Sequence, residues 1–110
     1  MSISALGSGL AGMQAFQNAV DLSANNVANA ETTGFQPLQA SFQDSAGGGV
    51  NVTATGPTVA QSAAAVGMPS GTDLVAETVS SLQYQFGFDL SAQVVKAADQ
   101  TLGTLINTVA

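Results

Sequence analysis

The sequence predicts a mainly α fold: two long terminal helices form a coiled-coil hairpin, joined by a short extended or β-hairpin segment, with no large surface domain. Apolar residues recur at helical spacing over the first and last thirds of the 110 residues, whereas the middle third loses this period. A chain of this length has room for one domain and for only a limited core. We expect an N-terminal helix in residues 1–34, an arm with a turn and a β segment in 35–71, and a C-terminal helix in 72–110, together forming one assembly domain.

The apolar period of the first third is close to that of a coiled-coil seam. Starting at Ile3, the spacing alternates between three and four residues for nearly four heptads, and Gln17 is the one polar break. The seam comprises Ile3, Leu6, Leu10, Met13, Gln17, Val20, Ala24 and Val27.

Glycines near the start of this helix weaken it. Ser2 or Ser4 can cap the helix, but Gly7, Gly9 and Gly12 each cost about 1 kcal/mol relative to alanine. We therefore expect the first turns to be weak in an isolated chain and to become ordered on assembly.

The middle third contains turn and strand signals. Gly34 is a stop signal for the first helix, and residues 35–42 can form an extended arm. Gly47-Gly48-Gly49 is a flexible turn, because no lysine or phosphate-loop pattern accompanies it. Residues 50–55 alternate and are rich in β-branched side chains, which predicts a short strand, and residues 58–61 are a candidate partner strand.

The last third is predicted to be one long helix over about residues 73–108. Thr72 or Asp73 can act as the N-cap, and Glu77 places negative charge where the helix dipole favours it. At 1.5 Å per residue this helix is over roughly 50 Å long. Its apolar stripe is Val75, Val79, Leu82, Phe86, Leu90, Val94, Ala97, Leu102, Leu105 and Val109.

Two such helices cannot fold into a compact globule, so we expect other copies of the chain to complete their faces. The alternative is a helical hairpin whose stripes pack within one molecule. The residues predicted to pack between subunits are Ile3, Leu6, Leu10, Met13, Val20, Val27, Val79, Leu82, Phe86, Leu90, Val94, Leu102 and Leu105.

Composition excludes several classes of function. Lys96 is the only basic residue against seven acidic ones, for a net charge of −6, which excludes nucleic-acid binding. The chain has no His and no Cys, and its carboxylates are scattered. We therefore expect no catalytic residues, no cofactor and no metal site. No apolar stretch is long enough to span a membrane, and the N-terminus lacks the features of a cleaved signal peptide.

The segment from Asp21 to Phe35 is the most specific in the chain. It contains three asparagines within five positions, although asparagine is a mediocre helix former. Asn25 and Asn29 share a helix face, so their amides can bond carbonyls at the helix end and on an adjoining chain. A plain polar helix end is the alternative. The motif positions are Asn25, Asn26, Asn29, Thr33, Gly34 and Phe35.

Together with Ser8-Gly9-Leu10 upstream, this segment resembles the N-terminal signature of the bacterial flagellar axial proteins, the rod and hook family. Residues 73–77 and 94–107 resemble the family's C-terminal helix, and the short middle is most similar to small proximal-rod subunits. The chain departs from the family pattern at Phe86, where an arginine is usual, at Ser91, where an asparagine is usual, and at Gln36, where a basic residue is usual.

The resemblance implies a non-enzymatic structural subunit that polymerises into a helical tube. It also implies export by the flagellar type III apparatus without signal cleavage, contact with other axial proteins, and a place in the basal body or an extracellular filament.

Three alternatives remain open. The first is a secreted helical-hairpin protein, although the tryptophan-containing turn expected there is absent, since the chain has no Trp. The second is a coiled-coil interaction protein, although its usual ion pairs could involve only Lys96. The third is a specialised rod-like filament that does not serve a motor.

Overall fold

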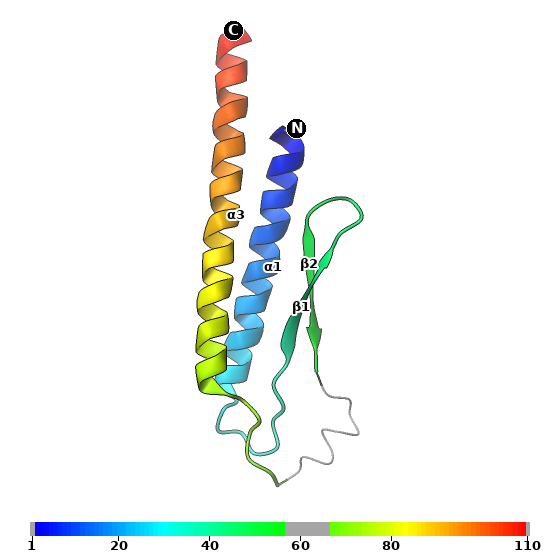
Figure 1. Ribbon diagram of the computed structural model, residues 1–110, viewed down its shortest axis with the longest axis vertical. Coiled ribbons are helices and arrows are strands. Elements are labelled where there is room, and N and C mark those ends of the chain that lie inside the picture. The colour runs from blue at the N-terminus through cyan, green and yellow to red at the C-terminus, as the bar shows by residue number, and fades with distance from the viewer. Residues whose placement is uncertain (1, 57–66, 110) are drawn as a thin grey trace.

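The computed structural model describes residues 2–56 and 67–109, and it has the expected mainly helical architecture. Helix α1 (Ser2–Ala28) is followed by strands β1 (Gln39–Asp44) and β2 (Val50–Thr55) and by helix α3 (Leu74–Val109). In Figure 1, α1 lies between α3 and the β-hairpin. The molecule measures 68 × 26 × 14 Å, so the two helices and the hairpin form a flat array. The described residues include no separate surface domain.

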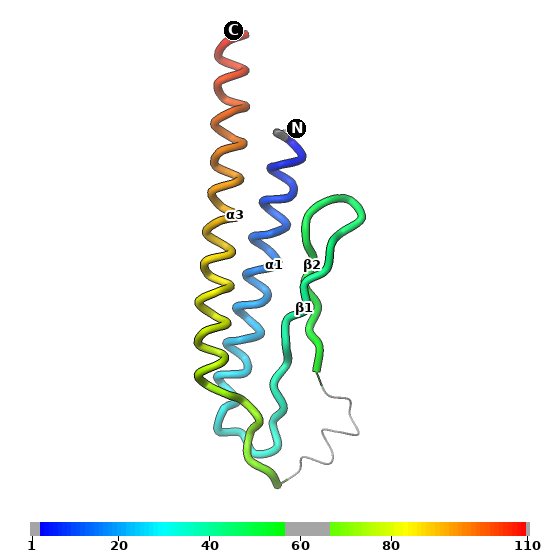
Figure 2. Tube along the Cα trace, viewed as in Figure 1, coloured from blue at the N-terminus to red at the C-terminus, as the bar shows by residue number. Residues whose placement is uncertain are grey.

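The two helices are antiparallel neighbours of unequal length. α1 has 27 residues and α3 has 36, and α3 extends past the N-terminal end of α1 (Figure 2). The expected long C-terminal helix is therefore present, and at about 1.5 Å per residue it is roughly 54 Å long.

The hairpin confirms one strand prediction and adds a strand that was not expected. β2 coincides with the predicted strand, but it pairs antiparallel with β1, from Gln39 opposite Thr55 to Asp44 opposite Val50. Residues 58–61, the predicted partner, lie outside the described residues. The glycine turn explains the observed pairing, because Gly48 and Gly49 take φ values of 91° and 89° and return the chain directly beside residues 39–44.

Local capping sets both helix ends near the connector. α1 ends at Ala28, and successive turns lead to Gly34, whose φ of 76° suits the left-handed region. At the start of α3, the Asp73 carboxylate accepts hydrogen bonds from the backbone N–H groups of Val75 (3.0 Å) and Ala76 (3.2 Å). Asp73 is therefore the N-cap, one of the two candidates that the sequence offered.

The helices pack through small residues, not through the large apolar side chains of the predicted seam. None of the eight seam positions is classed as buried. The buried positions of α1 form a parallel line of small or polar residues. They are Gly9, Gly12, Ala15, Ala19, Ser23 and Asn26.

Two glycines of this line permit a close approach of the helix axes. A Cβ on Gly9 would lie 2.6 Å from the Val95 Cγ2 atom, and one on Gly12 would lie 2.6 Å from the Ser91 Oγ atom. These glycines weaken an isolated helix, but in the folded chain they are required by the contact with α3.

An aromatic cluster joins the helix pair to the hairpin. The ring of Phe42 on β1 lies 5.3 Å from that of Phe16 on α1 and 5.8 Å from that of Tyr84 on α3, measured between centroids. The Phe16 ring covers Gly87, where a Cβ would lie 2.5 Å from it. Tilted pairs at these separations are favourable, so the cluster holds the hairpin against the helices.

Candidate assembly interface

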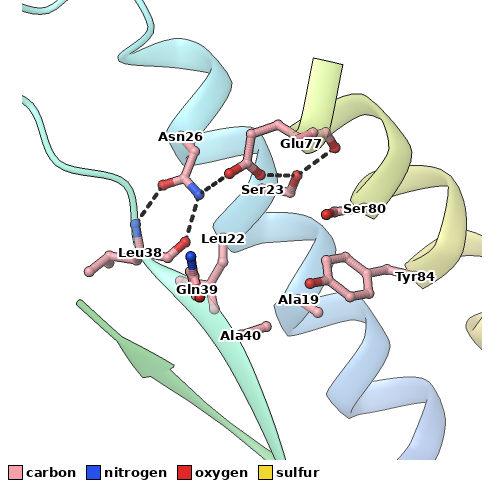
Figure 3. A pocket seen from close by; sticks show the side chains of 11 residues that line it. Ala19, Leu22, Ser23, Asn26, Leu38, Gln39, Ala40, Glu77, Ser80 and Tyr84 are labelled. Carbon is pink, nitrogen blue, oxygen red and sulfur yellow. Dashed lines mark hydrogen bonds between the residues drawn. The ribbon is translucent and has the colours of Figure 1, made fainter. Parts of the chain in front are cut away.

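A buried asparagine organises the junction where α1 ends and α3 begins. Asn26 is 1% exposed. Its side-chain amide donates to the Leu38 carbonyl (2.6 Å) and to the Glu77 carboxylate (2.9 Å), and its Oδ1 atom accepts from the Leu38 N–H (2.9 Å). Figure 3 shows Asn26 between Leu38, which lies just before β1, and Glu77 on α3. One side chain thus holds three segments in place.

Serines on both helices complete this junction. Ser23 is 2% exposed, and its hydroxyl donates to the Glu77 Oε2 atom at 2.7 Å. The Ser81 hydroxyl donates in turn to the Ser23 oxygen at 2.9 Å. In the described part of the chain, every buried side-chain nitrogen and oxygen has a hydrogen-bond partner. Glu77 therefore does more than complement the helix dipole, because it joins α3 to α1.

Hydrogen bonds, most of them between backbone groups, hold the two sides of the connector together. The Gly34 N–H donates to the Met68 carbonyl (2.5 Å), and the Gly71 N–H donates to the Phe35 carbonyl (2.9 Å). The Thr72 hydroxyl donates to the backbone carbonyl of Asn26 (3.1 Å). The chain leaving α1 thus lies against the chain entering α3.

The three asparagines of the motif have different roles. The Asn29 amide bonds the Asn25 carbonyl at the end of its own helix at 2.9 Å, as one part of the prediction stated. The Asn25 side chain is exposed, as is Thr33. Asn26, which the sequence placed in the motif without a specific partner, is the residue that joins the segments.

The predicted packing residues of α3 mostly face solvent. Val79, Leu82 and Phe86 are 50%, 61% and 65% exposed. They belong to a line spaced by three and four residues, which we call the α3 stripe. It comprises Val75, Val79, Leu82, Phe86, Leu90 and Val94, all exposed.

The predicted packing residues of α1 are also uncovered to a large extent. Ile3, Leu10 and Val27 are 78%, 53% and 42% exposed. The remaining α1 positions and one position near the end of α3 are half-buried. These are Leu6, Met13, Val20 and Leu102. Leu105, beyond them on α3, is 56% exposed.

The hollows between the elements are open to solvent, and the one beside the Asn26 junction is mostly polar. One of about 280 Å³ lies between α1, β1 and α3 beside the Asn26 junction, lined by residues that include Leu22, Ser80 and Tyr84 (Figure 3). Within residues 2–56 and 67–109, no three His, Cys, Asp or Glu side chains gather as metal ligands would. No helix in the same ranges has both the length and the apolar character needed to cross a bilayer.

The molecule is an elongated helical hairpin. Small residues and polar bonds close it, while its large apolar side chains face outward. This architecture is typical of a structural subunit. Comparison with known families agrees at both ends of the chain. The model for flagella basal body rod proteins matches residues 6–36, and the model for the C-terminal region of flagellar basal body rod FlgEFG proteins matches residues 69–108.

Individual relatives agree with these matches. The chain is 56% identical over 39 residues to flagellar hook protein FlgE of Helicobacter mustelae, and to the same protein of two Helicobacter pylori strains. The aligned stretch covers 36% of this chain but only 9% and 5% of those hook proteins. The chain belongs to the flagellar axial protein family of rod and hook proteins, and it is a structural flagellar component.

Proposed function

We propose that copies of this chain assemble into a helical tubular filament of the flagellar rod or hook type. The observation that carries the proposal is the division of the hairpin surface. Small residues close the contact between α1 and α3, while Leu82 and Phe86 on the α3 stripe remain more than half exposed. A row of such side chains is unfavourable in water, and neighbouring subunits would remove it from solvent.

The proposal extends to the place and partners of the subunit. In the described residues, the middle segment is a hairpin of two six-residue strands with no surface domain. This short middle supports a small proximal-rod type of subunit over a hook subunit. Its partners would then be further copies, other axial proteins and the flagellar export apparatus, in the basal body or an extracellular filament. Export without signal cleavage is part of the same proposal.

Leu82 on the stripe and Gln43 on the hairpin provide the test. Gln43 is exposed on β1 and follows Phe42, whose ring faces the helices, so the Gln43 side chain points away from them. Leu82→Asp should abolish polymerisation, because assembly would bury an unpaired charge. Gln43→Asp adds the same charge outside the stripe and should leave assembly largely intact.

Electron microscopy and sedimentation velocity over a concentration series would measure the outcome. Salt should be varied as well, since a net charge of −6 per copy opposes association until it is screened. A wild-type chain that stays monomeric at every concentration and salt would refute the proposal. Tubes formed equally well by Leu82→Asp would refute the role of the stripe.

A further inference from the structure

A groove runs along α1 on the side away from the hairpin. Two adjoining hollows of about 490 and 300 Å³ form it, and both are lined by Gln17 of α1 and Phe88 of α3. We call this surface the α1 groove. Its other apolar lining residues are Leu10, Met13 and Val20.

The α1 groove adjoins the surface that the hairpin covers but is not covered itself. Asn18 lines both the hollow beside β2 and the first groove hollow, so it marks the boundary. At about 100° per residue, Met13 and Val20 lie more than 100° around the helix from Leu22 and Asn25, which line the hollow beside β2. No residue of β1 or β2 lines either groove hollow.

The α3 stripe lies on a different side of the molecule. Glu77 and Tyr84 face α1 at the junction and the aromatic cluster, and Phe86 is turned by roughly 160° or more from each of them around the helix. In Figure 1, α3 forms one edge of the flat array. The stripe faces away from α1 and therefore follows this outer edge. None of its six side chains carries a charge.

Charge and area both favour a second copy of the chain as the occupant of the groove. A copy with a net charge of −6 repels another copy, so contact is favoured where both surfaces are nearly uncharged. Asp89 is the one charged residue that lines the groove hollows. The stripe exposes on the order of 300 to 600 Å² of apolar surface, as large as functional patches on monomers.

We propose that the α3 stripe of one copy docks into the α1 groove of the next. This inference rests on the proposed function and names the contact that would carry it. Stripe-to-stripe pairing would leave Leu10, Met13 and Phe88 uncovered, whereas stripe-in-groove pairing covers both surfaces in a single contact. The contact joins two different surfaces, so each bound copy presents a free stripe at one side and a free groove at the other, and the series continues.

The size of one contact has a further consequence. A standard stable interface buries roughly 800 Å² per partner, which is more than the stripe provides. A single stripe-in-groove contact is therefore weak, and subunits would be retained only where several neighbours bind them. Assembly should then show a sharp concentration threshold.

Two variants, each with one surface disabled, test the pairing. Phe86→Asp blocks the stripe and Leu10→Asp blocks the groove, and both native side chains are more than half exposed, so the fold should tolerate the changes. Each variant alone should fail to polymerise. An equimolar mixture should form no polymer, because only one intact stripe and one intact groove remain, and at high protein concentration it should populate a weak one-to-one heterodimer by native mass spectrometry.

Cysteine crosslinking can trap the weak contact as a covalent bond. The chain contains no cysteine of its own, so any disulfide must join the introduced positions. A copy carrying Leu10→Cys and another carrying Phe86→Cys should form an intermolecular disulfide on oxidation, well above the yield with Gln43→Cys in place of Phe86→Cys. Circular dichroism of each variant should show unchanged helix content.

The outcomes separate this inference from the proposed function. Dimers formed by Leu10→Asp alone would indicate stripe-to-stripe pairing and overturn it. Folded variants that neither complement nor crosslink, while the wild type polymerises, would also overturn it and leave the proposed function standing. A wild type that never polymerises would refute the proposed function itself.

Discussion

The two faces of α3 use opposite kinds of side chain. The face toward α1 meets small residues, and buried apolar side chains in the described chain are limited to Ala15, Ala19 and Ala98. The opposite face carries Leu82 and Phe86, both more than 60% exposed. A chain that folded alone would place its largest apolar side chains inside.

This contrast teaches how stability is divided in the molecule. Close helix contact, the aromatic cluster and the polar junction hold one copy together, whereas the larger apolar side chains remain available to neighbours. The free energy of unfolding and the tendency to assemble should therefore respond to different residues. Variants can test this separation directly.

The junction should give the largest loss of stability. Asn26→Ala removes three side-chain hydrogen bonds and leaves the Leu38 backbone groups and the Glu77 carboxylate without this partner. Unsatisfied buried groups cost about 1 to 3 kcal/mol each, so we expect a loss of roughly 3 kcal/mol or more in the free energy of unfolding. Urea denaturation followed by circular dichroism measures it.

Asn25→Ala is the matched control, because its side chain is exposed one residue away. Its effect should stay within about 0.5 kcal/mol. Equal losses for the two variants would show that the asparagines act through helix-end propensity and not through the junction.

Replacing glycines of α1 should change the free energy of unfolding less than Asn26→Ala does, and in opposite directions at Gly9 and Gly7. Gly9→Ala places a Cβ 2.6 Å from Val95 and 3.3 Å from the Ser91 carbonyl oxygen, whereas a Cβ at Gly7 meets nothing within 4 Å. Overpacking costs about 1 to 3 kcal/mol, and the gain in helix propensity is about 1 kcal/mol. We expect a net loss near 1 kcal/mol at position 9 and a gain of up to about 1 kcal/mol at position 7.

Thermal and urea unfolding of the two variants, compared with the wild type, would reveal the opposite signs. If both substitutions stabilise the chain, the helices are not in close contact at Gly9. Such a result would remove the structural basis for separating the two faces.

The fold could be predicted from the sequence because helical periodicity and turn chemistry are local. The long C-terminal helix, the Asp73 cap and the glycine turn all follow from neighbouring residues. The pairing of β2 with β1 did not follow, because residues 35–42 and 58–61 offered competing extended segments and register depends on tertiary contact.

The candidate site was predicted only in part, for a physical reason. Large apolar residues dominate a periodicity analysis, so the stripe was found and the buried line of small residues was missed. The signal for that line was present in the spacing of Gly9, Gly12, Ala15, Ala19 and Ser23. The role of Glu77 at the junction could not be predicted, because its partner Asn26 lies 51 residues away and no local pattern indicates the contact.

The stripe should give the smallest effect on the stability of a single copy. Val79 is 50% exposed and lies on the face away from α1, so Val79→Ser should change the unfolding free energy of the monomer by no more than about 0.5 kcal/mol. The same substitution should raise the concentration threshold for assembly, because it removes apolar surface that a neighbour would cover. Unfolding below the threshold and light scattering above it measure the two effects separately. A loss of monomer stability comparable to that of Asn26→Ala would mean that the stripe already supports the single chain, and the division between folding face and assembly face would not hold.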